Sequence, residues 1–117
     1  MPNSLKTDRQ AYYLERKDIT SPHAHLLAYQ TNHTLAINSV SAYHHLQSQK
    51  ESKPNSLGRD ILYEGKLAAS RASIDAWLMG EVLASKGKEP KIFTGRLFEE
   101  IAFLNEELDK AQQRLSA

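Results

Sequence analysis

The sequence contains no cysteine among its 117 residues. This absence excludes disulfide bonds, thiolate metal sites and cysteine nucleophiles together, and it suits a reducing compartment. Uninterrupted apolar runs extend over only a few residues, far fewer than the roughly 20 that a membrane-spanning helix needs. No apolar run follows Lys6, so we expect no secretory signal peptide, and we predict a soluble, cytoplasmic protein.

An excess of charge of either sign is also lacking, because 15 lysines and arginines nearly balance 14 aspartates and glutamates and the formal net charge is only +1. The composition, 40% hydrophobic and 25% charged, is that of a globular protein. The length suits one domain with a modest core and is too short for two ordinary domains. We therefore predict a single domain over residues 1–117.

Motifs of catalysis are missing as well: the sequence has no nucleophile elbow, phosphate-binding loop or dinucleotide fingerprint. Arg71 and Asp75 are spaced as an ordinary ion pair within a helix. An enzyme would need a concave pocket that holds at least two of His33, His44, Glu64 and Asp75. We expect that the protein is not an enzyme and that it has no cofactor.

Five histidines are present, yet no two of them have a spacing that places both on one face of a helix within reach of one metal ion. His23 and His25 are two residues apart, and His44 and His45 are adjacent. We expect partly buried, hydrogen-bonded or surface histidines and no metal site. A site assembled across helices, or a pH-sensitive or partner-contacting role, is the alternative.

Prolines at positions 22, 54 and 90 divide the chain into segments that predict helices. Thr7 and Gln10 have the spacing of a capping box, which predicts a short helix over 8–17. Ser21 followed by Pro22 predicts the start of a long helix. The poor helix formers at 31–34 leave open whether residues 22–50 form one helix or two, and residues 34–43 have an alternative interpretation as a strand.

A third helix is predicted over 59–86, with Gly87 at its C-cap. Its main apolar stripe includes a series of small residues at every fourth position. Such a series lets another helix approach closely. The members of this series are Ala68, Ala72, Ala76 and Gly80. Gly65 and Gly80 are costly inside a helix, so close packing is the reason we assign to them.

A fourth helix is predicted over 96–115, capped by Thr94. Its apolar residues alternate four- and three-residue steps, the spacing of a coiled-coil seam. The seam consists of Leu97, Ile101, Leu104, Leu108, Ala111 and Leu115. It either packs into the core of the domain or mediates self-association as a homo-oligomer interface. We predict an all-α fold, a small bundle of three long helices plus a short N-terminal one, in which the third and fourth helices form the tightest pair.

Three aromatic residues lie off these apolar stripes: Trp77, Phe98 and Phe103. Aromatic side chains left outside a core are candidate anchors for a protein partner. Tyr12 and Tyr13 are similar candidates. The sequence therefore favours a non-enzymatic interaction protein, such as an adaptor, an inhibitor or a small subunit.

The alternative is a nucleic-acid-binding accessory protein or transcriptional regulator. Its candidate phosphate contacts are Arg59, Lys66, Lys86, Lys88 and Lys91. Residues 39–46 resemble a recognition helix in their residue types, with small polar residues followed by an aromatic and an apolar residue. A helix-turn-helix would also need a turn, which the segment 31–34 could supply. This segment has no lysine or arginine before Lys50, which leaves little to hold phosphates.

Overall fold

The computed structural model describes residues 4–48, 55–88 and 91–116. They form four α-helices: α1 (Leu5–Arg16), α2 (Pro22–Ser48), α3 (Asn55–Ser85) and α4 (Lys91–Ser116). The described residues contain no strand. The predicted all-α bundle of three long helices and a short one is confirmed.

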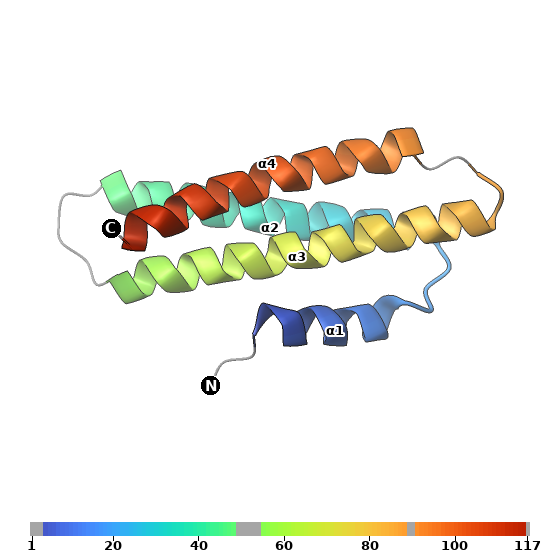
Figure 1. The fold of residues 1–117 in the computed structure, drawn as a ribbon, viewed down its shortest axis with the longest axis horizontal. Coiled ribbons are helices and arrows are strands. Elements are labelled where there is room, and N and C mark those ends of the chain that lie inside the picture. The colour runs from blue at the N-terminus through green and yellow to red at the C-terminus, as the bar shows by residue number, and fades with distance from the viewer. Residues whose placement is uncertain (1–3, 49–54, 89–90, 117) are drawn as a thin grey trace.

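The three long helices lie side by side, and α1 packs against the outer side of α3 (Figure 1). In this view α3 lies between α1 and α4, with α2 behind it. The most extensive helix pair is α2 with α3, so the prediction that the third and fourth helices pack most tightly was wrong. The physical reason is that small residues at the contact, such as Ala36 and Ser39 on α2 and Gly65 on α3, let these two helices come close together.

Two predicted helix starts differ from the structure. Ser4 caps α1, because its hydroxyl oxygen accepts a hydrogen bond from the Thr7 backbone N–H at 3.1 Å. Thr7 therefore lies inside the first turn. Likewise α4 begins at Lys91, so Thr94 is a buried residue within the helix and not its cap.

The segment 22–48 is one continuous helix. Ser21 caps it as predicted, accepting a hydrogen bond from the Ala24 N–H at 3.2 Å. The strand over 34–43 and the turn at 31–34 are both contradicted, and no helix-turn-helix forms in this segment. Contacts within the helix and burial on either side of this segment offset the weak local preference, since Asn32 donates its side-chain amide to the Ala28 carbonyl, His33 stacks on Tyr29, and Tyr29 and Ala36 are buried.

The end of α3 follows the prediction, whereas its start lies four residues earlier than predicted. Gly87 adopts a φ of 75°, the left-handed conformation that glycine enters at little cost. The Lys88 N–H donates to the Leu83 carbonyl and the Gly87 N–H to the Ala84 carbonyl. These two bonds make a Schellman cap.

The core consists of two clusters that lie along the three long helices. The first contains Ala36, Tyr43, Leu62, Ala68, Ala69, Leu104, Leu108 and Ala111. The second contains Tyr29, Ala72, Ala76, Met79, Leu97 and Ile101. The predicted small-residue series of α3 is therefore buried at Ala68, Ala72 and Ala76, where short side chains let the neighbouring helices come close.

Two tyrosines of α2 connect this core to the backbone of α4. The hydroxyl of Tyr29 donates to Glu100 Oε1 at 2.6 Å and lies 3.3 Å from the Leu97 carbonyl oxygen. The hydroxyl of Tyr43 donates to the Ala111 carbonyl at 3.3 Å. Both side chains are buried, so each polar group enters the core with its partner in place.

Gly65 marks the closest approach of the three long helices. A Cβ atom at this position would lie 2.9 Å from Ser39 Cβ and 2.9 Å from Leu108 Cδ2. We expect Gly65→Ala to lower the free energy of unfolding by about 1–3 kcal/mol, because overpacking outweighs the gain in helix propensity. Urea denaturation followed by circular dichroism measures this loss.

Gly80→Ala is the matched control, since the nearest atom to its Cβ would be Thr94 Cγ2 at an ordinary 3.5 Å. We expect Gly80→Ala to be neutral or to raise the free energy of unfolding by up to about 1 kcal/mol. Equal effects of the two substitutions would contradict the close approach at Gly65.

Candidate functional site

None of the residues of α1 is buried. Polar contacts therefore account for much of what holds this helix to α3. Arg71 donates from Nε and Nη2 to the two carboxylate oxygens of Asp8, at 3.1 and 2.7 Å. Arg9 donates from Nη1 to the hydroxyls of Ser70 and Ser73, at 2.7 and 3.2 Å. These contacts place the first two turns of α1 over the middle of α3.

The last turn of α1 is held by a buried carboxylate. Asp75 of α3 is fully buried, and it accepts hydrogen bonds from Arg16 Nε at 2.7 Å and from the Tyr12 hydroxyl. Its third partner is His25 Nδ1 of α2, at 2.9 Å. The predicted pair of Arg71 with Asp75 is wrong: each residue has its partners on other helices, because α1 inserts its own charged groups between them.

His25 is buried with an acceptor at each ring nitrogen. Nδ1 faces the Asp75 carboxylate and Nε2 faces the Ile19 carbonyl oxygen, both at 2.9 Å. A carbonyl oxygen only accepts, and the Asp75 carboxylate also accepts from Arg16, so both ring nitrogens of His25 face acceptors. The cluster thus joins α1, α2, α3 and the α1–α2 connection, and its polar atoms are used within the chain.

Two tyrosine hydroxyls in these networks have a shifted pKa. Burial first, and then the hydrogen bond to Asp75, raises the pKa of Tyr12 well above 10. Burial and then the hydrogen bond to Glu100 raise the pKa of Tyr29 in the same way. Both hydroxyls therefore stay protonated donors through the physiological range.

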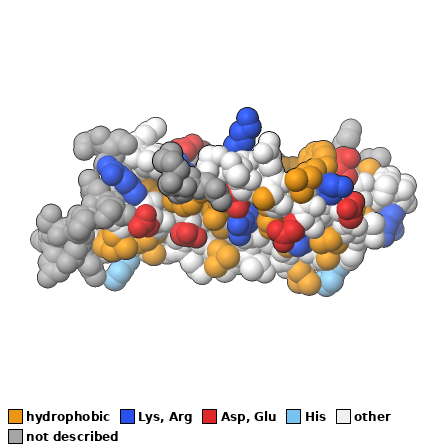
Figure 2. Space-filling view, turned by 90° about the horizontal axis from the view of Figure 1, so that it is seen from below, with side chains coloured by type: hydrophobic (Ala, Val, Ile, Leu, Met, Phe, Trp, Pro, Cys, Tyr) orange, Lys and Arg blue, Asp and Glu red, His pale blue; other side chains and the backbone are white. Residues whose placement is uncertain are grey.

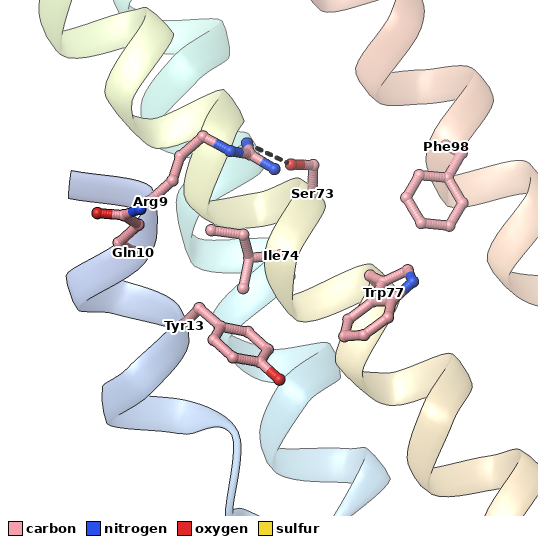
Figure 3. A pocket seen from close by; sticks show the side chains of 7 residues that line it. All are labelled: Arg9, Gln10, Tyr13, Ser73, Ile74, Trp77 and Phe98. Carbon is pink, nitrogen blue, oxygen red and sulfur yellow. Dashed lines mark hydrogen bonds between the residues drawn. The ribbon is translucent and has the colours of Figure 1, made fainter. Parts of the chain in front are cut away.

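Beside this network, the surface holds an aromatic groove between α1 and α4, with α3 as its floor (Figure 3). Its volume is about 350 Å³, within the range of about 300–1,000 Å³ that ligand sites usually have. Seven side chains line it: Arg9, Gln10 and Tyr13 from α1, Ser73, Ile74 and Trp77 from α3, and Phe98 from α4.

The aromatic members of this groove remain accessible. Trp77 is 48% exposed and Phe98 is 39% exposed. The rings of Tyr13 and Trp77 contact each other with their centroids 6.1 Å apart and a tilt of 53°. Three helices therefore contribute three aromatic rings to one hollow on the surface.

A second hollow of about 390 Å³ adjoins the first and shares Arg9 and Ser73 with it. This hollow is more polar, because Lys66, Ser70, Asn105 and Asp109 line it. Arg9 thus lies at the boundary between an apolar and a polar part of one surface.

The predicted partner anchors do not all meet. Trp77 and Phe98 line the aromatic groove, whereas Phe103 does not. Phe103 is 66% exposed, and five residues turn it about 140° around α4 from Phe98. Only two of the three anchors therefore belong to one site.

The predicted self-association seam lies in the chain's own core, which is the other alternative that its spacing allowed. Leu97, Ile101, Leu104 and Leu108 are at most 5% exposed. They pack against α2 and α3, so a second copy cannot reach them in this fold. The side chain of Leu115 lies outside the described residues.

The predicted phosphate contacts do not form one patch. Arg59 and Lys66 line a hollow together with Asp60, and Lys66 Nζ lies 4.0 Å from Asp109 Oδ1. Lys86 and Lys88 are exposed at the other end of α3, roughly 30–40 Å away along the helix axis. The side chain of Lys91 lies outside the described residues. On the face that carries α1, basic and acidic side chains alternate with small apolar groups (Figure 2).

The residues that an enzyme would bring together are apart. Glu64 lines a small hollow of about 120 Å³ between α2 and α3, while Asp75 is buried with its oxygens paired. His33 stacks on Tyr29, and His44 is exposed beside the ring of Tyr43. Within residues 4–48, 55–88 and 91–116, no three histidines, aspartates or glutamates are grouped to hold a metal ion.

Arg9, Ser73 and Ile74 are groove residues that the sequence analysis did not single out. A signal was present, because Arg9 and Tyr13 are four residues apart and so share one face of α1. Ser73 and Trp77 show the same spacing on α3. What the sequence alone did not reveal is that these two faces meet.

Comparisons with protein-family models, curated proteins and solved structures return no match. None of the helices, searched over their described residues, is long and apolar enough to cross a membrane.

Proposed function

We propose that this chain is a non-enzymatic interaction protein, an adaptor, inhibitor or small subunit, that binds a protein partner in the aromatic groove. The observation that carries the proposal is the meeting of Tyr13, Trp77 and Phe98, from three helices, in one accessible hollow. Large rings at such positions supply most of the binding free energy in protein interfaces.

The way in which the two walls of the groove are held supports this role. The ionic contacts of α1 fix one wall of the groove, and the core contacts of α4 fix the other. A groove whose walls are held in advance loses little conformational entropy when a partner binds. The polar atoms of the Asp75 cluster are paired within the chain, so they favour a structural role over a catalytic one.

We expect the double variant Trp77→Ala/Phe98→Ala to reduce partner recovery at least tenfold, because both anchors of the groove are truncated. The measurement is affinity purification of the tagged chain from its native cells, with quantitative mass spectrometry of the proteins that it retains. Circular dichroism checks that the variant stays folded.

The matched control is Leu14→Ala/Phe103→Ala, which truncates two exposed apolar side chains outside the groove. Its partner recovery should equal that of the unmodified chain. If the control lost the same partner, or if the groove variant kept every partner, the aromatic groove would not be the binding site.

A further inference from the structure

We infer that the groove binds a segment of a protein partner in which a large apolar side chain lies next to a carboxylate, with Arg9 as the group that selects the acidic residue. This inference rests on the proposed function and names the chemistry of the partner. It is carried by the position and the bonding of Arg9.

Arg9 is the only charged residue among the seven that line the aromatic groove. The contacts of its guanidinium to Ser70 and Ser73 all use Nη1. Among the described residues, Nε and Nη2 have no hydrogen-bond partner, and no carboxylate lies within salt-bridge distance of Arg9. Two serines therefore hold the cation in place and leave donors for an incoming group.

The nearest acid in the sequence does not neutralise this charge. Asp8 directs both carboxylate oxygens to Arg71, at 2.7 and 3.1 Å. A fixed guanidinium with unused donors is complementary to a carboxylate, which it binds through charge-assisted hydrogen bonds.

The two hollows fit the two parts of the partner segment, its large apolar side chain and its carboxylate. The aromatic groove offers rings and Ile74 to an apolar side chain, and its volume of about 350 Å³ accommodates one or two large side chains. The adjoining polar hollow begins at Arg9 and also contains Lys66 and Asp109, whose charged groups lie 4.0 Å apart and offset each other. A segment that crosses Arg9 therefore places its apolar residue on one side and its acidic residue at the boundary.

The test is selection of a phage-displayed library of random 14-residue peptides against the full chain and against Arg9→Glu. We expect the unmodified chain to enrich peptides with Phe, Leu or Trp within one helical turn of Asp or Glu. We expect Arg9→Glu to retain the apolar preference and to replace the acidic residue by Lys or Arg. Trp77 is the only tryptophan in the chain, so its fluorescence reports the affinity of a selected peptide that lacks tryptophan.

For a selected acidic peptide, Arg9→Gln should weaken binding about tenfold. Lys6→Gln is the matched control, because it removes a positive charge from an exposed position of α1 outside the groove lining. It should change the affinity less than twofold. Circular dichroism confirms that both variants are folded.

Three outcomes would overturn the inference. Apolar peptides without an acidic preference, bound equally by Arg9→Glu, would remove the role of Arg9 and leave the proposed function standing. Failure to enrich any peptide would remove both. Self-association that the groove variants abolish would make the occupant a second copy of this chain.

Discussion

Replacing Asp75 with alanine is expected to lower the free energy of unfolding by about 3–5 kcal/mol, because it leaves the part-buried Arg16 and the buried His25 ring without their acceptor. Asp75 is 0% exposed and accepts hydrogen bonds from Tyr12, Arg16 and His25, residues of two other helices. His25 is also fully buried, and its Nδ1 would then face no acceptor. Urea denaturation monitored by circular dichroism measures the loss.

The matched control is Asp8→Ala, which removes the other carboxylate of the contact between α1 and α3. Its partner Arg71 is 37% exposed, so water compensates the guanidinium and the cost should be about 1 kcal/mol or less. If both variants lost the same free energy, burial of the Asp75 cluster would not be the source of its contribution.

Alkaline pH is expected to destabilise the domain through Tyr12 and Tyr29. Both have a folded-state pKa raised by burial and by a carboxylate hydrogen bond, above a value near 10 in the unfolded chain. Their contribution to stability is complete below pH 10 and is lost as the pH rises above it. With about 1.4 kcal/mol per tyrosine and pH unit, the free energy of unfolding should fall by about 2–3 kcal/mol between pH 9 and pH 11.

Urea midpoints at pH 9, 10 and 11 measure this decline, and the absorbance of phenolate follows the ionisation directly. Tyr12→Phe/Tyr29→Phe should start from a lower stability and lose little more as the pH rises. Tyr13→Phe, at an exposed position, is the control and should keep the decline of the unmodified chain. An unchanged decline in the double phenylalanine variant would assign the alkaline transition to other groups.

The fold class followed from the sequence because the apolar stripes are long and regular. The stripe of α4 from Leu97 to Ala111 identified one apolar face with two alternative roles, and packing into the chain's own core is the alternative that the structure shows. Gly87 predicted the end of α3, since few other residues adopt its backbone conformation. These features depend on residues close together in the chain.

Contacts between distant residues were much harder to predict. Arg71 and Asp75 have ideal spacing for an ion pair, yet Asp8 and Arg16 of α1 provide their partners. Spacing within one helix says nothing about charges that another helix brings to the same place. Trp77 and Phe98 could be identified as exposed aromatic residues, because an aromatic side chain off the apolar stripe is conspicuous in a sequence. Arg9 could not be identified in this way, because an arginine on a polar helix is not conspicuous.

The two tyrosine bonds from α2 to α4 have a consequence for how the bundle fixes a single alignment of its helices. Interfaces built on alanine, such as those at Ala36, Ala72 and Ala76, are smooth and discriminate poorly between alignments shifted along the axis. The hydroxyls of Tyr29 and Tyr43 bond to the carbonyls of Leu97 and Ala111, which are separated by the same number of residues as the tyrosines themselves. A slip of one turn would offer both hydroxyls other carbonyls, since backbone carbonyls repeat along a helix, but it would carry the Glu100 carboxylate about 5.4 Å away from Tyr29. The hydrogen bond from Tyr29 to Glu100 therefore disfavours a shifted alignment that the carbonyl bonds alone would tolerate.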